Sequence, residues 1–107
     1  MLVSVALFEI HIPYAQSLKD KRMVVKSLRD KLRNRFEISA GEVGLHDVHQ
    51  RARMAVSFVA GDHASADAIL ERVLSFVETN TDATLTGWTT EVLEFDEMAT
   101  LGVPHFS

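Results

Sequence analysis

The sequence predicts an α+β domain in which one antiparallel sheet carries two helices on a single face. Alternating apolar residues indicate strands, two longer segments repeat apolar residues at helical spacing, and Pro, Gly and Asp residues separate these runs. In chain order the elements are β-α-β-β-α-β, the ferredoxin-like split βαβ pattern. Right-handed crossovers then predict the sheet order 4-1-3-2, with strands numbered along the chain.

The first strand and the first helix have the clearest boundaries. Residues 2–12 alternate in the manner of a strand, which Pro13 ends, and the even positions should face the core. Ser17 and Asp20 form a capping box that opens a helix reaching Phe36. The apolar stripe of this helix recurs at helical spacing and consists of Leu18, Val24, Val25, Leu28, Leu32 and Phe36.

Three strands and one helix complete the pattern. The two middle strands should pair around a turn near residues 44–47, and Gly61 with Asp62 should end the second of them and cap the helix. These elements are expected at residues 37–43 (strand), 51–60 (strand), 63–80 (helix) and 84–95 (strand). Residues 1–95 therefore form the single predicted domain, and residues 96–107 are expected to be a loosely held tail.

Composition restricts the function classes further. A chain of 107 residues has room for one modest core. The chain has no cysteine, which excludes disulfides, thiolate metal sites, iron–sulfur clusters and a cysteine nucleophile. The apolar start lacks a positive leader and is interrupted by Glu9 and His11, so we expect a cytoplasmic protein. His46 and His49 are weak candidates for metal ligands, because no third ligand accompanies them.

The predicted fold leaves the sheet face opposite the helices bare. The odd positions of the first strand and one position of the last strand would place apolar side chains on this open face: Val3, Val5, Leu7 and Leu93. Exposed contiguous apolar surface marks association sites. We therefore expect a homodimer or a larger homo-oligomer that assembles through the open face.

Charge is strongly segregated along the chain. Residues 17–36 hold eight basic and two acidic residues, a net charge of +6, while the remainder carries −10. Five of the basic residues recur at spacings of three and four, so they stack along one side of the helix. We call these five the basic ridge: Lys19, Arg22, Lys26, Arg29 and Arg33. At about 1.5 Å per residue the ridge spans roughly 21 Å, enough to follow several phosphates of a nucleic acid.

The start of the same helix breaks a local rule. Lys19, Lys21 and Arg22 lie in its first turns, where the helix dipole and free N–H groups favour negative charge. Lys21 also falls within the apolar arc of the helix. One interpretation is that Lys21 and the first-turn N–H groups hold an anion. The other is that Lys21 lies beyond the sheet edge and extends to water.

The basic ridge has three interpretations. It binds a polyanion, it is a solvated face partly neutralised by the acidic residues of the second helix, or it binds an acidic protein. The strand at residues 51–60 lacks the aromatic residues on which ferredoxin-like RNA-binding sheets stack bases. If RNA binds, the first helix is therefore the better candidate.

A polar cluster is expected on the open face. Glu9 and His11 should lie beside Arg51 and Arg53 on the third strand and Glu91 on the fourth. The cluster is a candidate for general acid–base chemistry, but an exposed ion-pair network across the strands explains the same residues more simply. The sequence contains no glycine-rich phosphate loop, nucleophile elbow or zinc helix motif.

Several short motifs resemble the YlxP-like family of small uncharacterised bacterial proteins. These motifs are His11-Ile12-Pro13, Gln16-Ser17-Leu18-Lys19-Asp20-Lys21-Arg22, Val24-Val25-Lys26-Ser27-Leu28, Asn34-Arg35-Phe36 and Gln50-Arg51-Ala52. The resemblance covers about residues 1–95, and it departs at His49, where the family has a bulky apolar residue. It implies a ferredoxin-like fold, no established catalytic residues, and genes that often neighbour those for translation initiation and ribosome maturation.

The sequence thus predicts a non-enzymatic protein without cofactor or metal that binds RNA or a ribonucleoprotein. The ridge residues would contact phosphates, and Lys21 would hold one further anion. Two alternatives are a small-ligand-binding regulatory domain, similar to amino-acid-binding βαββαβ modules, and a protein–protein adaptor.

Overall fold

The computed structural model of the chain describes residues 1–80 and 82–104. Within them the chain forms six elements in the predicted order. These are β1 (Leu2–His11), α1 (Leu18–Phe36), β2 (Ser39–Gly44), β3 (Arg51–Ala60), α2 (His63–Thr79) and β4 (Thr84–Glu94).

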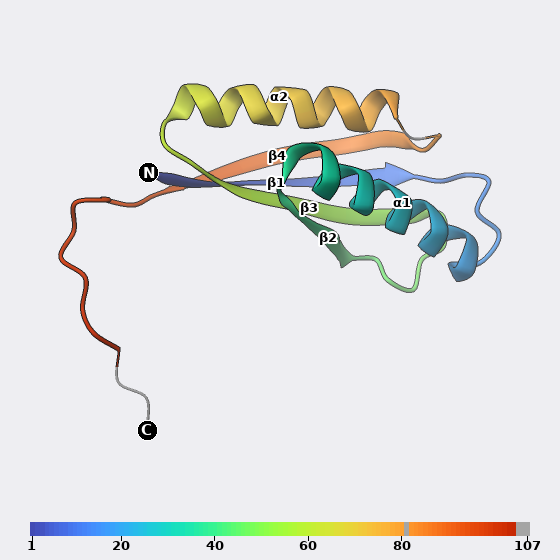
Figure 1. Ribbon diagram of the computed structural model, residues 1–107. Helices are drawn as coiled ribbons and strands as arrows, with labels where there is room; N and C mark the ends of the chain where they lie inside the picture. The colour runs from blue at the N-terminus through green and yellow to red at the C-terminus, as the bar shows by residue number, and fades with distance from the viewer. Residues whose placement is uncertain (81, 105–107) are drawn as a thin grey trace.

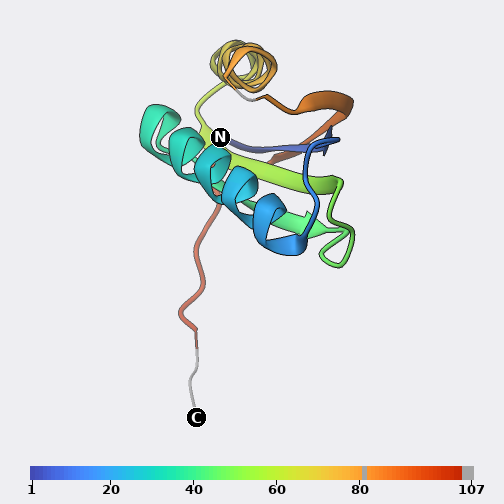
Figure 2. The ribbon, with the colours of Figure 1, turned by 90° about the vertical axis from the view of Figure 1, so that its right-hand side faces the viewer.

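The four strands form one antiparallel sheet in the order β2-β3-β1-β4, which is the predicted order read from the other edge. Both helices lie on the same side of this sheet (Figures 1 and 2). The predicted ferredoxin-like topology is therefore confirmed. In this topology β2 and β4 are the edge strands, and α1 packs mainly over β2 while α2 crosses β3, β1 and β4.

The core lies between the helices and the inner face of the sheet. The even residues of β1 and β3 are buried on this side and alternate with half-buried or exposed neighbours, as the period of a strand requires. Val25, Leu28 and Leu32 of α1 and Leu70, Val73 and Val77 of α2 cover them. Burial of one stripe on each helix against one sheet face gives the two-layer architecture.

A bulge in β4 adjusts which of its residues reach the core. The register shifts between Glu9 and Ile10 of β1, so that Gly87 lies opposite Glu9 and Leu85 opposite Ile10. The extra residue lets both Leu85 and Trp88 pack against the core, although strict alternation would send them to opposite faces. The ring of Trp88 stacks on Phe8 at 5.7 Å between ring centres.

The bounds of β2 differ from the predicted ones at both ends, and β1, α2 and β4 each end one residue earlier than predicted. Glu37 does not begin β2 but caps α1, with a left-handed φ of 52° and its N–H donating to the carbonyl of Arg33 at 3.0 Å. β2 ends at Gly44, one residue later than predicted, and the connection to β3 covers residues 45–50. Leu45 in this loop also has a left-handed φ, of 59°. A glycine is the usual signal for this conformation, so the sequence did not mark either position.

Beyond Glu94 the described chain has no helix or strand, and the tail leaves the body of the domain (Figure 1). It is attached at its start: the N–H of Phe95 donates to the carbonyl of Met1 at 2.9 Å, and the N-terminal ammonium bonds Glu97 at 2.6 Å. The ammonium lowers the pKa of Glu97. That the tail is loosely held stays a prediction, and residues 105–107 of it lie outside the described residues.

Candidate nucleic-acid interface

The predicted N-cap at Ser17 is confirmed, whereas the second bond of a capping box goes to Gln16 instead of Ser17. Ser17 has extended backbone angles, and its Oγ accepts a hydrogen bond from the N–H of Asp20 at 3.1 Å. The carboxylate of Asp20 in turn accepts from the N–H of Gln16 at 3.0 Å. The Ser17 bond satisfies a donor that the helix start leaves open, and the Asp20 bond ties the preceding residue to the first turn, so together they fix the direction of α1. The direction of α1 sets the position of the basic ridge.

The basic ridge lies along one exposed flank of α1. Lys19, Arg22, Lys26 and Arg33 are exposed, and Arg29 is half-buried. Arg29 pairs with its neighbour Asp30 at 3.2 Å. Among the described residues the other four ridge side chains have no acidic group within 4.0 Å. The ridge is therefore a row of cations whose charge the described part of the chain does not cancel locally.

The ridge and α2 lie on opposite sides of α1. Residues Met23, Ser27 and Lys31 of α1 face the end of α2, where they line a cleft with Thr79 and Asn80. The ridge positions lie on the other flank of the helical wheel. There, Arg33 borders a groove lined by Ile38 and by residues 39–41 and 43 of β2. The acidic residues of α2 therefore do not contact the ridge, although the sequence allowed that arrangement.

Lys21 is not part of this surface, and its predicted role is wrong. Its side chain is buried, with the residue only 1% exposed, and its Nζ lies 2.8 Å from a carboxylate oxygen of Glu42. The same Nζ donates to the carbonyl of Leu45 at 2.5 Å. Lys21 thus neither holds an external anion nor extends to water. It neutralises a carboxylate of its own chain.

The pair between Lys21 and Glu42 joins α1 to β2 and to the loop after it. Glu42 is on the inner face of β2, opposite Met54, so its carboxylate points towards the helices. The 2.8 Å contact is an ion pair without hydrogen-bond angles at that oxygen. Sequence reasoning missed Glu42. The sequence places Glu42 at an inward-facing position of a strand, and a buried carboxylate there needs a cationic partner. That placement could have identified it.

Gln50 makes a second connection at the same end of the sheet. Its side-chain amide donates to the backbone carbonyls of Pro13 and Ala15, both at 3.4 Å. The backbone carbonyl of Gln50 accepts a hydrogen bond from the N–H of Ile12 at 2.8 Å. The loop before α1 and the loop before β3 are therefore held together by one residue. Four residues of the motifs quoted above, Ser17, Asp20, Lys21 and Gln50, act within the chain to position α1.

Comparison with known proteins gives the family. A family model described as "Protein of unknown function (DUF503)" matches residues 3–90. The chain belongs to this family. The curated Bacillus subtilis (strain 168) protein described as "Uncharacterized protein YlxP" is 32% identical over 77 residues, which cover 72% of this chain and 84% of that protein. The resemblance to the YlxP-like family is confirmed.

A structural comparison supports the fold alone. A de novo designed protein with a ferredoxin fold, solved by solution NMR, aligns with a TM-score of 0.56 and 15% identity. The alignment covers 100% of this chain and 98% of the designed one. The DUF503 match itself spans the ridge, Lys21, Glu42 and Gln50, and ends before Leu93. No described helix is long and apolar enough to cross a bilayer.

The polar cluster on the open face is an ion-pair network. Glu9 on β1 bonds Arg51 through two nitrogens at 3.0–3.1 Å and Arg53 at 3.1 Å. Hydrogen bonds from Arg53 and then Arg51 lower the pKa of Glu9. Glu91 lies opposite Val5, further along the sheet, and so does not join the network. The carboxylate is held by both guanidinium groups, an arrangement that keeps it charged and acceptor-only.

The four predicted association residues share the open face. Val3, Val5 and Leu7 of β1 alternate with buried residues, and Leu93 of β4 lies opposite Val3. Val5 and Leu7 are 37% and 36% exposed, and Leu93 is 58% exposed. Val59 of β3, also opposite Val3, extends this apolar surface and was not singled out from the sequence.

The loop that contains His46 and His49 does not form a metal site. His46 lies 4.0 Å from Glu42, and His49 is exposed in the same loop. Within the described ranges no three His, Asp or Glu side chains come together as a metal site would require.

Proposed function

We propose that this DUF503 protein is a non-enzymatic binding protein that contacts the backbone of RNA, free or within a ribonucleoprotein, along the basic ridge of α1. The observation that supports it is the row of four exposed cations without acidic partners in the described chain. Such a row attracts a polyanion because each neutralised phosphate releases condensed counterions. The acidic remainder of the chain, with a net charge of −10, would repel a polyanion elsewhere and so favours this one orientation.

The geometry of the ridge supports contact with the backbone rather than with the bases. The five residues rise along one flank over about 21 Å and are all long, flexible or forked donors suited to phosphate oxygens. The one aromatic residue of α1, Phe36, packs on Phe76 of α2 and against the core, so its ring is not free to stack on bases. We therefore expect an RNA affinity that falls steeply with salt and depends little on the RNA sequence.

The test is the salt dependence of binding to a single-stranded RNA oligomer, measured by fluorescence anisotropy. Four or five phosphate contacts at about −0.7 each predict a log–log slope of about −3 to −3.5. The triple variant Arg22→Gln, Lys26→Gln, Arg29→Gln should flatten that slope by about 2.

The matched control reverses Asp67→Lys and Glu71→Lys on the exposed side of α2, which should not weaken binding. If the triple variant binds as tightly as the parent at every salt concentration, the ridge is only a solvated face. Recovery of partners from lysate before and after nuclease treatment separates RNA from an acidic protein. A partner that survives nuclease would favour the adaptor interpretation.

We also propose that a second copy of the chain covers the open face. β1 and β3 have ten residues and β2 has six, so the four-stranded sheet has a face of at most about 33 by 19 Å. That size approaches the roughly 800 Å² that each partner buries in a standard interface. The apolar centre around Val5, Leu7 and Leu93 suits the buried core of such an interface.

Light scattering at micromolar protein should therefore report a dimer or a larger homo-oligomer. The variant Leu7→Glu places a charge at the centre of the face and should shift the protein to monomer. The matched control, Met23→Glu, changes an exposed residue of α1 and should leave assembly unchanged. A monomeric parent at micromolar concentration would show that this face does not self-associate.

A further inference from the structure

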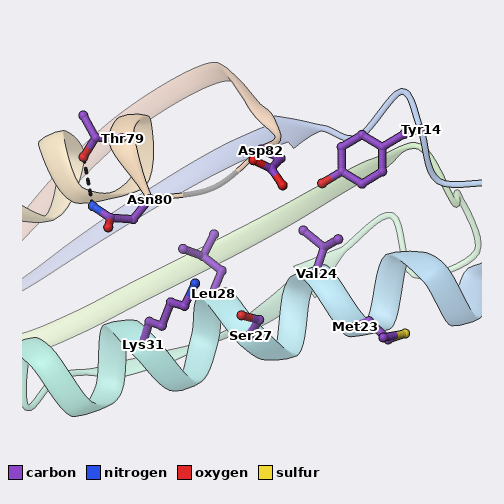
Figure 3. Close-up of a pocket in the computed structure, with 9 residues that line it drawn as sticks. All are labelled: Tyr14, Met23, Val24, Ser27, Leu28, Lys31, Thr79, Asn80 and Asp82. Atoms are coloured by element: carbon purple, nitrogen blue, oxygen red, sulfur yellow. Dashed lines mark hydrogen bonds between the residues drawn. The ribbon is translucent and has the colours of Figure 1, made fainter.

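The flank of α1 that faces α2 carries a separate feature, a cleft of about 340 Å³ (Figure 3). We call it the interhelical cleft and define it by Tyr14, Val24, Leu28, Lys31, Asn80 and Asp82. Its volume is at the lower end of the range for small-molecule sites. It contains no ridge residue, so it is distinct from the proposed RNA contact.

Opposite charges line the two walls of the interhelical cleft. Lys31 extends from α1 into the space, while Asp82 lies on the other wall, beyond the end of α2 (Figure 3). The two charged groups do not form an ion pair within 4.0 Å, and neither has another such partner in the described part of the chain. Each is therefore available to a charged group of a ligand.

The wall around Asp82 favours a cation for a second reason. The C-terminal end of α2 lies there, represented by Thr79 and its cap Asn80. A helix C-terminus carries partial negative charge, and the last turn of α2 contains no basic residue to offset it. The hydroxyl of Tyr14 is directed towards Asp82 (Figure 3), and burial, then the charge of Asp82, raises the pKa of this hydroxyl. Tyr14 is therefore a neutral donor at this wall.

The floor of the cleft between the charged walls is apolar. Val24 and Leu28 form it, and Met23, which is largely exposed, borders it. A ligand that fits has a carboxylate for Lys31, an ammonium for Asp82 and the α2 end, and an aliphatic group for the floor. A free α-amino acid combines these three groups within a molecule small enough for the space.

We propose that the interhelical cleft binds a free aliphatic α-amino acid. Lys31 holds the carboxylate, Asp82 and the end of α2 hold the ammonium, and Val24 and Leu28 contact the side chain. Because the cleft is open to water, the expected dissociation constant for leucine is about 1 mM. Binding there would give the domain a small-ligand site independent of its ridge.

The test is calorimetric titration of the full chain with leucine and with two analogues that each lack one charge. Isoamylamine has no carboxylate and 4-methylpentanoate has no ammonium, so each should bind about tenfold more weakly than leucine. Thermal unfolding with about 10 mM leucine should show a melting temperature about 5 °C higher.

Variants locate the site. Lys31→Gln and Asp82→Asn should each weaken leucine binding about tenfold, and Lys31→Gln should leave isoamylamine binding unchanged. Lys26→Gln, on the opposite flank of the same helix, is the matched control and should bind leucine like the parent. The proposal is overturned if leucine gives neither heat nor a thermal shift at about 10 mM, or if both analogues bind as well as leucine. RNA binding by the ridge is measured separately and does not depend on either outcome.

Discussion

Two lysines of α1, Lys21 and Lys26, have opposite environments although they are only five residues apart. Lys21 is buried and paired with Glu42, whereas Lys26 is exposed and has no acidic partner in the described residues. Five residues correspond to about 140° of rotation around a helix, enough to move a side chain from the sheet side to the outer flank. Position around the helix therefore decides whether a lysine is paired inside the fold, as Lys21 is, or exposed on the outer flank, as Lys26 is.

Neutralising each lysine in turn should have very different effects on stability. Lys21→Met should lower the free energy of unfolding by about 3 kcal/mol, because it leaves Glu42 largely buried without a cation. Lys26→Met should change it by less than about 0.5 kcal/mol. Urea unfolding of both variants measures the difference. Replacing the pair together, Lys21→Met with Glu42→Leu, should recover most of the lost stability. Equal stability of Lys21→Met and Lys26→Met would contradict a structural role for Lys21.

A smaller effect is expected at the start of α1, which sets the direction of both flanks. Ser17→Ala removes the bond to the N–H of Asp20 and should cost about 1 kcal/mol. Ser27→Ala, at an exposed position inside the same helix, should be neutral or slightly stabilising because alanine is the better helix former. Thermal unfolding of the two variants checks this, and a loss at Ser27 as large as at Ser17 would argue against a capping role.

Acid sensitivity tests the ion-pair network on the open face. The folded-state pKa of Glu9 lies below its ordinary value of 4.5, because Arg53 and Arg51 stabilise the carboxylate. Its contribution to stability is therefore complete above about pH 4.5 and is lost as pH falls through the lowered folded-state pKa. The pKa values of Asp62 and Glu97 are also lowered in the folded protein. Protonation of all three carboxylates should therefore destabilise the parent in acid.

Glu9→Gln should remove part of this acid dependence and destabilise the protein slightly at neutral pH. Glu91→Gln changes an exposed glutamate without an ion pair in the described residues and serves as the control. The free energy of unfolding, measured from pH 3 to 7, should fall less steeply in acid for Glu9→Gln than for the parent or for Glu91→Gln. The difference should appear in the pH range where carboxylates titrate. Parallel curves for the parent and Glu9→Gln would show that the network contributes nothing to folding.

The fold could be predicted because its signals are local. Alternation in β1 and β3, the apolar stripes of both helices and the caps Ser17 and Asp62 all agree with one topology. The partners of Lys21 could not be predicted in the same way. Glu42 and Leu45 are more than twenty residues away in sequence, and their contact depends on the register of β2 and on a left-handed loop residue without glycine.

The ridge was predictable from spacing alone, whereas its freedom from acidic neighbours required the fold. Residues 19–33 fix which cations share a flank. Only the three-dimensional arrangement places α2 on the other flank and leaves the ridge unopposed by the acids of that helix. The interhelical cleft likewise depends on the approach of Tyr14 and Asp82, which the sequence separates widely.

An NMR titration of the ¹⁵N-labelled full chain with a short single-stranded RNA tests directly whether RNA binds the outer flank of α1. If the ridge binds RNA, we expect chemical-shift changes at Lys19, Arg22, Lys26, Arg29 and Arg33. Little change is expected at Ser27, Lys31 and Asp82, which lie across the helix. Added salt should reverse the ridge changes. Shifts concentrated on the open sheet face or in the interhelical cleft, or no shifts at low salt, would contradict the assignment of α1's outer flank to RNA.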